Sequence, residues 1–312
     1  MKIKSLKKLS TNAKHNAFTD LCVFKTSLYC CFRQASNHVS SDGLIRINIL
    51  NVAGENSSNS FIKMANTDLR DPKLTVSPDG KLILLAYARY FADNGQRLIT
   101  QNLCWVSQDG LSWSAPRVVG PNYWWLWRIR WRAYTAYGFA YNRQANAIDF
   151  YQGDPRRTFN KIVTGALSLQ KHQLGYPNES DLVFIDKHCY ALVRRDADTY
   201  TAQLGRSCYP FKRWVWQDLD FYLGGPVMQL LDKQSALVAG RIIHQQQLKT
   251  AIFKLNLVTG VASEKLLLPS GGDNSYPGMI IIGRQVYLSY YSSHQAPQQD
   301  CKSAVYLAQI SL

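Results

Sequence analysis

The sequence has few of the features that would place it in a membrane or among helical proteins. No stretch approaches the roughly eighteen consecutive apolar residues that a membrane-spanning helix needs. The basic start of the chain is not followed by the apolar run of a secretory signal peptide. Helical periodicity is almost absent, while short β-branched and aromatic runs separated by turn residues fill the chain. These patterns favour an all-β protein without a membrane partner.

Motifs for several common chemistries are also missing. The chain has no HExxH, no GxSxG, no P-loop and no GxGxxG after a strand. Its six histidines are scattered without the spacing of metal ligands. No helix-turn-helix, zinc-finger or RNA-binding signature accompanies the formal charge of +15. We therefore expect no metal, no cofactor and no nucleic-acid partner.

The cysteines also lack the number and spacing that are typical of a disulfide-bonded protein. The seven cysteines are an odd number, no two have CxxC spacing, and several lie inside apolar strand patterns. Buried free thiols in a reducing compartment explain this pattern, so we expect a cytoplasmic protein. Five lysines fall within the first fourteen residues. We therefore predict a basic disordered tail over residues 1–15, followed by a single domain over residues 16–312, in a monomer.

A hairpin that recurs about every fifty residues is the main positive signal. Each copy is a strand, a short turn and a second strand ending in Arg or Tyr. Taking the apolar residue three after each start as an anchor, the anchors are Val23, Leu74, Ile129, Leu182, Met228 and Met279. Third strands follow the hairpins, for example over Leu44–Leu50, and the polar stretch after Leu50 indicates a surface loop. An even repeat predicts a six-bladed β-propeller with four-stranded blades, whereas the rival β-sandwich predicts no such repeat.

One turn carries a recognisable motif. Residues Ser107–Trp113 read SQDGLSW, which resembles the Asp box of sialidases and related propellers. The Asp109 carboxylate is placed to accept hydrogen bonds from its own turn, while Trp113 packs between strands. A weaker echo runs from Ser207 to Trp214. An Asp box stabilises the fold and by itself indicates no catalytic activity.

The ends of the hairpins extend the resemblance to bacterial sialidase-like propellers, over residues from about 16 to 312. The segments DLRDPKL, NESDL and SYPGM are similar to segments of that family. The resemblance implies that Glu179 and Tyr276 are the catalytic glutamate and the nucleophilic tyrosine. It further implies an arginine clamp for the substrate carboxylate, made by Arg33, by Arg194 or Arg195, and by Arg241. In a propeller, such inner-strand ends are expected to converge around the axis.

These residue types suit one chemistry. Three guanidinium groups offer charge-assisted, bidentate hydrogen bonds to the carboxylate of a sialic acid. That carboxylate would repel an anionic nucleophile, whereas a phenol that loses its proton to a neighbouring carboxylate avoids the conflict. Sialidases with a tyrosine nucleophile are a known exception to the paired-carboxylate rule. Structural roles for the same residues, as ion-pair partners or packing groups, remain the competing interpretation.

The acid that protonates the leaving group does not match the family pattern. The loop after Arg33 holds no matching aspartate, so His38, Asp42 and Asp71 are the candidates. An aromatic run containing Trp125 and Trp127 is either a wall that stacks on sugars or part of the core between blades.

Two functions follow from this sequence. One is a sialidase-like glycoside hydrolase acting on a glycan with an acidic sugar. The alternative is a non-catalytic propeller that binds a carbohydrate or another anion.

Overall fold

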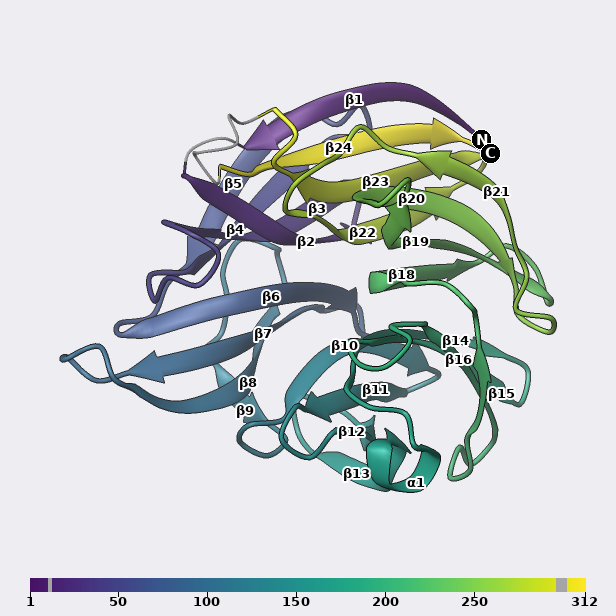
Figure 1. Ribbon diagram of the computed structural model, residues 1–312. Helices are drawn as coiled ribbons and strands as arrows, with labels where there is room; N and C mark the ends of the chain where they lie inside the picture. Colours follow the sequence, from purple (N-terminus) through teal and green to yellow (C-terminus); the bar gives the residue numbers. More distant parts are fainter. Residues whose placement is uncertain (11–12, 296–301) are drawn as a thin grey trace. The chain divides into compact units, whose positions relative to one another are not determined.

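The computed structural model describes residues 1–10, 13–295 and 302–312. These residues form six four-stranded antiparallel sheets, drawn in Figure 1. Six such sheets, each built around a repeated hairpin, are a six-bladed β-propeller, so the predicted fold class is confirmed. The chain divides into two compact units, Met1–Tyr123 with Pro269–Leu312 (unit 1) and Trp124–Leu268 (unit 2). The assignment of residues 16–312 to a single domain stays a prediction.

Unit 1 contains three blades. Blade 1 comprises β2 (His15–Phe24), β3 (Ser27–Ala35), β4 (Leu44–Leu50) and β5 (Asn56–Ile62). Blade 2 comprises β6 (Thr67–Val76), β7 (Leu82–Phe91), β8 (Arg97–Ser107) and β9 (Arg117–Val119). Blade 6 comprises β22 (Asn274–Ile282), β23 (Gln285–Ser292), β24 (Ala304–Ser311) and, at its edge, β1 (Lys2–Ser10). The first strand of the chain thus completes the same sheet as the last, and the two termini lie side by side in Figure 1.

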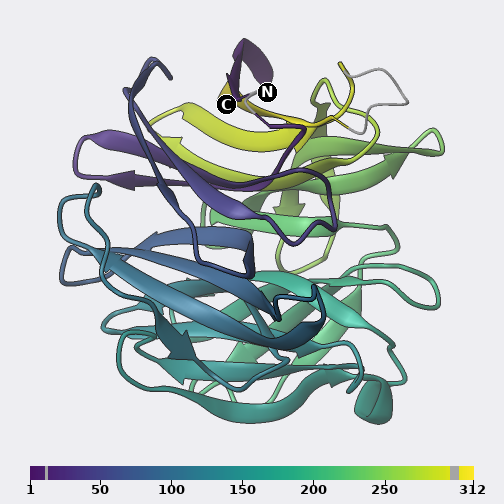
Figure 2. The same ribbon diagram turned by 90° about the vertical axis from the view of Figure 1, so that its left-hand side faces the viewer.

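Unit 2 contains the other three blades. Blade 3 comprises β10 (Trp125–Arg132), β11 (Thr135–Asn142), β12 (Ala147–Gly153) and β13 (Phe159–Ser168). Blade 4 comprises β14 (Pro177–Ile185), β15 (His188–Arg195), β16 (Gln203–Cys208) and β17 (Val215–Asp218). Blade 5 comprises β18 (Gly224–Leu230), β19 (Ser235–His244), β20 (Gln247–Asn256) and β21 (Ala262–Leu267). A short helix, α1 (Leu169–His172), protrudes after β13 in both ribbon views (Figures 1 and 2). Within the described ranges, no helix has the length and apolar character to cross a bilayer.

Two expectations about polar segments were wrong. The predicted disordered tail instead contains β1, which pairs with β24 from Lys2↔Ser311 to Ser10↔Val305. The polar stretch after Leu50, expected to be a loop, contains β5, the exposed outer strand of blade 1. Both are edge strands with few buried side chains. Because an edge strand exposes much of its surface to water, its sequence lacks the apolar alternation by which inner strands are recognised.

Every blade carries a β-bulge in its inner hairpin. In blade 6 the ladder passes from Ser275↔Tyr291 to Gly278↔Ser289, so two residues of β22 oppose one of β23. The same two-against-one shift occurs in the other five blades. The unpaired residues are Phe18–Thr19, Asp71–Pro72, Trp127–Arg128, Asn178–Glu179, Gly225–Pro226 and Tyr276–Pro277. Bulges redirect side chains and concentrate near active sites, so this shared position is a natural place for chemistry.

Buried aspartates join neighbouring blades within each unit. Asp20 in blade 1 accepts a 2.8 Å hydrogen bond from the backbone N–H of Leu74 in blade 2. Asp181 in blade 4 accepts an equivalent 2.8 Å bond from Met228 in blade 5. The apolar residues of blades 1 and 2 form one continuous core, and those of blades 4 and 5 form another. At Gly278 a side chain is impossible, because its Cβ would lie 2.1 Å from the backbone nitrogen of Leu21.

Candidate functional site

In unit 1 the candidate nucleophile belongs to a cluster around the buried ring of Phe18. The rings of Tyr276 and Tyr291 lie 5.4 and 5.6 Å from it, edge-on. The ring of His38 lies at 5.1 Å, and the Arg70 guanidinium stands over the face of Phe18 at 5.0 Å. Phe18 occupies the bulge of blade 1, as Tyr276 does in blade 6. The two bulges therefore meet through their aromatic rings.

The backbone of Tyr276 is held in an uncommon conformation. Its φ is 46°, in the left-handed region, and Ser275 before it has a φ of 90°. The Tyr276 carbonyl accepts a 2.9 Å hydrogen bond from Thr19 Oγ1, a residue of the blade 1 bulge. The side chain is half-buried. Strained, tightly held residues of this kind persist where the surroundings determine their position, so the ring is well placed for a fixed task.

Asp71, one of the three predicted acids, lies in the bulge of blade 2. It is buried, with a φ of 47°, and its Oδ2 is 3.9 Å from Nε of Arg70. Burial raises the pKa of Asp71 although the charges of Arg70, Lys73 and Arg89 oppose the shift. A buried carboxyl with a raised pKa is suited to donating a proton.

The other two predicted acids have different surroundings. Asp42 accepts hydrogen bonds from the backbone N–H and the hydroxyl of Ser36. Burial opposes its ionisation, but the hydrogen bonds from Ser36 and Ser40 outweigh it and lower the pKa of Asp42. This carboxylate stabilises a turn. His38 is half-exposed and contacts Asp273, as described below. Of the two aspartates, Asp71 has the surroundings that favour the protonated form.

Arg33, predicted to bind the substrate carboxylate, has no exposed surface. Its Nε donates to Asp68 Oδ1 at 2.7 Å, and its two terminal nitrogens donate to the carbonyls of Asn37 and Ser40 at 2.9 and 2.8 Å. The backbone of Gly43 covers this pair so closely that a Cβ there would lie 2.0 Å from Asp68. In this structure Arg33 holds the loop that follows its own strand.

Two further arginines give this part of unit 1 a positive character. Arg70 Nη1 donates to the carbonyl of His38 at 2.9 Å and to Asp68 Oδ2 at 3.1 Å. Arg89, at the end of β7, is largely buried, and burial together with repulsion from Arg70 lowers its pKa. Arg33 responds in the same way. The mutual repulsion indicates an excess of cations over the carboxylates of Asp68 and Asp71.

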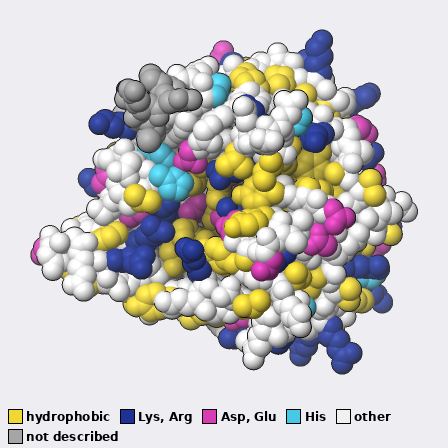
Figure 3. Space-filling model, in the orientation of Figure 1, with side chains coloured by type: hydrophobic (Ala, Val, Ile, Leu, Met, Phe, Trp, Pro, Cys, Tyr) yellow, Lys and Arg dark blue, Asp and Glu magenta, His cyan; other side chains and the backbone are white. Residues whose placement is uncertain are grey.

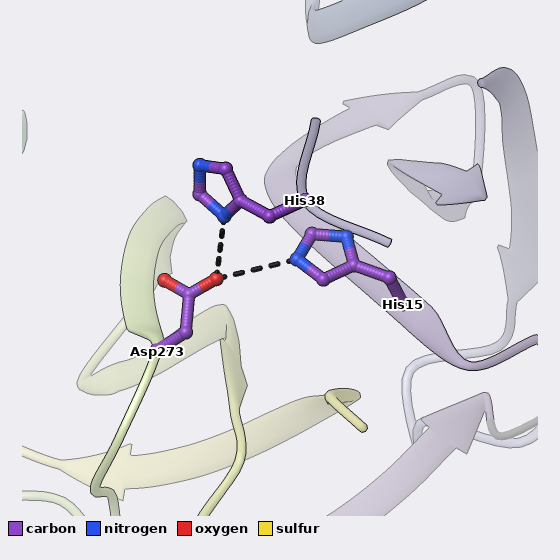
Figure 4. A group of neighbouring side chains, drawn as sticks. All are labelled: His15, His38 and Asp273. Atoms are coloured by element: carbon purple, nitrogen blue, oxygen red, sulfur yellow. Dashed lines mark hydrogen bonds and ion pairs between the residues drawn. The ribbon is translucent and has the colours of Figure 1, made fainter. Parts of the chain in front are cut away.

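A group of three titratable side chains lies at the edge of this cluster. His15 Nε2 and His38 Nδ1 are 3.2 and 2.7 Å from the same oxygen, Oδ2 of Asp273 (Figure 4). Tyr291 donates to the other oxygen at 2.6 Å. Burial opposes ionisation of Asp273, but these hydrogen bonds hold its pKa below the usual range. In the space-filling view, histidine and acidic side chains lie together beside Lys and Arg side chains (Figure 3).

In unit 2, Glu179 lies in the bulge of blade 4 and is paired with Arg194. Arg194 Nη1 is 2.6 Å from Glu179 Oε2, and Arg194 also donates from Nε to Asp196 at 2.9 Å. The Arg194 guanidinium stands over the ring of Tyr222 at 5.6 Å. Asn178, the other bulge residue, donates to the same Asp196 at 2.9 Å. Glu179 and Arg194 are therefore brought together across the bulge of blade 4.

The remaining predicted arginines of unit 2 differ from one another. Arg195 has no exposed surface and donates to Asp198 at 2.5 Å and to the carbonyl of Gly175 at 3.2 Å. Arg241 is half-buried and lies opposite Gly224, one residue before the bulge of blade 5. Burial raises the pKa of Tyr222, and Arg194 and Arg241 both act on that phenol. Strand alternation thus separates the two neighbours: Arg194 faces Glu179, whereas Arg195 secures a loop.

The two predicted tryptophans differ in burial. Trp127 is buried in the bulge of blade 3. Trp125 is half-buried, and its ring stacks on Tyr141 with a centroid distance of 5.6 Å and an interplanar angle of 12°. The accessible ring is therefore that of Trp125. An open groove of about 790 Å³ elsewhere in unit 2, lined by residues such as Arg206, Tyr209 and Trp216, contains none of the predicted site residues.

Several site residues were not identified from the sequence. Phe18, Arg70 and Tyr222 are central to the two clusters, and none was singled out. For Arg70 the sequence did hold a signal: it immediately precedes Asp71, a predicted site residue, in the segment RDP. In the structure, Asp71 begins the bulge of blade 2. No sequence signal pointed to the grouping of His15, His38 and Asp273, which come from three separate segments.

Comparisons with known proteins show the fold. No protein family model and no curated protein matches the sequence. A crystal structure of a protein of unknown function from Dyadobacter fermentans superposes with a TM-score of 0.84 at 16% identity, covering 99% of this chain and 98% of that one. The NanB sialidase of Streptococcus pneumoniae gives a TM-score of 0.73 at 10% identity, covering 100% and 71%.

A third structure is the Trypanosoma rangeli sialidase in complex with sialic acid. It has a TM-score of 0.67 at 8% identity and covers 99% of this chain and 57% of that one. At these identities the likeness is one of fold: the chain has the six-bladed propeller fold of sialidases.

Proposed function

We propose that this propeller, which has the fold of sialidases, is a glycoside hydrolase acting on a glycan that contains an acidic sugar. The observation that carries the proposal is the shared position of three residues. Asp71, Glu179 and Tyr276 each occupy the bulge of the inner hairpin in their own blade. Asp71 and Tyr276 are the first of the two bulge residues in blades 2 and 6, and Glu179 is the second in blade 4, so the proposed acid, nucleophile and base all belong to this bulge. The sialidases among the structural neighbours support this choice of chemistry.

The proposed reaction has two steps. In the first, the Tyr276 hydroxyl attacks the anomeric carbon and loses its proton to a carboxylate base, the role predicted for Glu179, while the bond to the leaving oxygen breaks and Asp71 protonates that oxygen. In the second, water attacks the same carbon and the tyrosyl bond breaks. The proton of the water passes to Asp71, and that on the base returns to Tyr276. Two displacements at one carbon retain its configuration.

The substrate carboxylate is assigned to arginines that keep some exposure. Arg194 and Arg241, which are half-buried and both act on the phenol of Tyr222 in unit 2, meet this condition. Arg33 and Arg195 were also predicted for this clamp. Because protein acceptors surround both of them, we propose that they fix the loops beside the site.

A non-catalytic propeller that binds an acidic carbohydrate is the second candidate. Two observations favour it. Two of the predicted clamp arginines, Arg33 and Arg195, donate hydrogen bonds to protein carboxylates. Glu179, the proposed base, is paired with Arg194 at 2.6 Å. Such a protein would bind the same ligands and turn none of them over.

Turnover separates the two candidates. The purified protein is incubated with a panel of aryl glycosides, including sialosides, together with Tyr276→Phe and Glu179→Gln. The hydrolase proposal predicts release of the aryl group by the native protein and a loss of at least about 10²-fold in each variant. Tyr290→Phe, one residue from Tyr291 and outside the cluster, is the matched control and keeps full activity. Binding of a sialoside without turnover supports the second candidate.

A further inference from the structure

His15, His38 and Asp273 come from three separate segments of unit 1. His15 begins β2, His38 lies in the loop after β3, and Asp273 immediately precedes β22. One ligand-type atom from each lies within 4.8 Å of the others. Figure 4 shows both imidazoles directed at a single carboxylate oxygen. Two histidines and one carboxylate are a donor set that binds divalent transition metals in proteins.

The separations fit a common metal ion. Zinc bonds of about 2.0–2.2 Å at tetrahedral angles place neighbouring donor atoms roughly 3.4 Å apart. The His15 Nε2 to Asp273 Oδ2 distance is 3.2 Å, and His38 Nδ1 is 2.7 Å from the same oxygen. Movement of about 0.7 Å by the half-exposed His38 side chain would widen its 2.7 Å separation from Asp273 to roughly 3.4 Å. The two imidazole centroids, 5.2 Å apart, do not obstruct it.

The surroundings prepare the groups for ligation. Tyr291 donates a 2.6 Å hydrogen bond to Asp273 Oδ1, which leaves Oδ2 directed at the histidines. A hydrogen bond of this kind to a ligating carboxylate is typical of outer-shell partners in metal sites. Among the residues that the structure describes, Nδ1 of His15 has no hydrogen-bond partner, so no described acceptor fixes which ring nitrogen carries the proton.

We propose that His15, His38 and Asp273 bind one divalent transition-metal ion, with zinc as the representative ion. Three protein ligands leave at least one coordination position open, as in catalytic and substrate-binding zinc sites. His38 is the most exposed ligand, with 49% of its side-chain surface accessible, so the open position faces solvent. Water or an anionic group of a ligand is the expected occupant. The donor set contains too few oxygens for calcium or magnesium.

The alternative explanation needs no metal. Two imidazoles, each donating to Asp273, would join blade 1 to blade 6 by hydrogen bonds alone. Asp273 together with one histidine would then suffice for stability, and added metal would have no specific effect. The two explanations differ in metal affinity, which does not depend on any enzymatic activity.

The experiment titrates Zn²⁺ into the metal-stripped full-length protein by isothermal calorimetry. Cobalt(II) serves as a spectroscopic probe, because its visible absorption reports coordination by nitrogen and oxygen ligands. We expect one high-affinity Zn²⁺ per chain, and no such binding of Ca²⁺ or Mg²⁺. His38→Ala removes an exposed ligand with little risk to the fold, and Asp273→Asn keeps the shape of the carboxylate. Both are expected to weaken Zn²⁺ binding by more than the roughly 10–100-fold cost of losing an outer-shell partner.

Two further variants make the result specific. Tyr291→Phe removes the outer hydrogen bond and is expected to weaken Zn²⁺ binding by about 10–100-fold. His244→Ala alters a histidine of blade 5 and is expected to leave the affinity unchanged. Absence of Zn²⁺ binding by the native protein overturns the proposal. So does an affinity that survives both His38→Ala and Asp273→Asn while those variants keep the native circular dichroism and unfolding temperature.

Discussion

Arg194 Nη1 lies 2.6 Å from Glu179 Oε2, directly across the bulge of blade 4. Two residues of β14 are unpaired there, and Arg194 is the single residue of β15 that opposes them. The bulge thus places a carboxylate and a guanidinium of adjacent strands face to face. Asp196 accepts hydrogen bonds from both Arg194 and Asn178 and limits the movement of this pair. The base of the proposed reaction is held in one orientation by its own hairpin.

The first prediction concerns the energy of this pair. Arg194→Ala leaves Glu179 buried beside Asp196 without its counter-ion, so the free energy of unfolding should fall. Glu179→Gln in the same chain should recover part of the loss, because the unpaired charge is then removed. A double-mutant cycle by urea unfolding should give a coupling energy of about 1 kcal/mol or more. Additive effects of the two substitutions would show that the pair contributes no net stability.

The second prediction uses the raised pKa of Asp71. Its folded-state pKa lies above the unfolded value because burial disfavours the charge. The folded state therefore binds more protons, and the stability contributed by this group is lost as pH rises from about 4 through the folded pKa. Asp71→Asn, which tolerates the φ of 47°, lacks this term.

The stability of Asp71→Asn relative to the native protein should therefore increase between pH 4 and pH 7, as measured by urea unfolding. Its turnover should fall by about 10²–10⁴-fold if Asp71 is the acid. A stability difference that does not change with pH would contradict the raised pKa. Asp79→Asn, at an exposed hairpin turn, is the control.

The third prediction separates two arginines that the sequence treated alike. Arg33→Gln removes the counter-ion of buried Asp68 and should destabilise the protein by roughly 3–5 kcal/mol. Arg241→Gln should keep the unfolding temperature within a few degrees. It should, however, weaken binding of an acidic sugar by about tenfold or more, the cost of one charge-assisted hydrogen bond. Calorimetric titration with a sialoside and thermal unfolding measure the two effects. The reverse pattern would indicate that Arg33, rather than Arg241, binds the acidic sugar.

The fourth prediction tests the contacts between blades 3, 4 and 5. Arg130 of blade 3 donates to both oxygens of Asp181 at 2.8 and 2.6 Å, and Asp181 accepts from the Met228 N–H. Asp181→Ala leaves a partly buried guanidinium and a backbone N–H unsatisfied. We expect a loss of about 3 kcal/mol or more in the free energy of unfolding. Asp186→Asn, at an exposed turn with a φ of 52° that asparagine tolerates, should change stability by less than about 0.5 kcal/mol.

The repeated hairpin made the fold predictable. The site was harder to predict, because it depends on which residues of neighbouring strands pair with each other. Inner strands bury both faces, so their apolar runs recur visibly and all six hairpins were located. Edge strands β1 and β5 were missed because their side chains are mostly exposed. In blade 1 the predicted anchor, Val23, lies two residues after the position that is equivalent to Met279 of blade 6. Leu21 lies three residues before the hairpin's last paired residue, Phe24, just as Met279 precedes Ile282.

That shift of two residues concealed Phe18, the bulge residue of blade 1. In blades 4 and 6 the predicted anchors Leu182 and Met279 each lie three residues before the last paired residue of the strand, so Glu179 and Tyr276 each stand six residues before the end of the strand. The grouping of His15, His38 and Asp273 depends on loops from different segments, which no local pattern encodes. The burial of Arg33 and Arg195 was equally hidden, because alternation assigns a face and does not reveal which loop covers that face.

The most direct test of the account is to identify the residue that carries the glycosyl intermediate. A fluorinated sialosyl fluoride, which slows the second step, is incubated with the native protein, and the digested peptides are analysed by mass spectrometry. We predict an adduct on Tyr276 in the native protein and none in Tyr276→Phe. Turnover of sialosides accompanied by an adduct on another residue, or by none at all, would contradict the account.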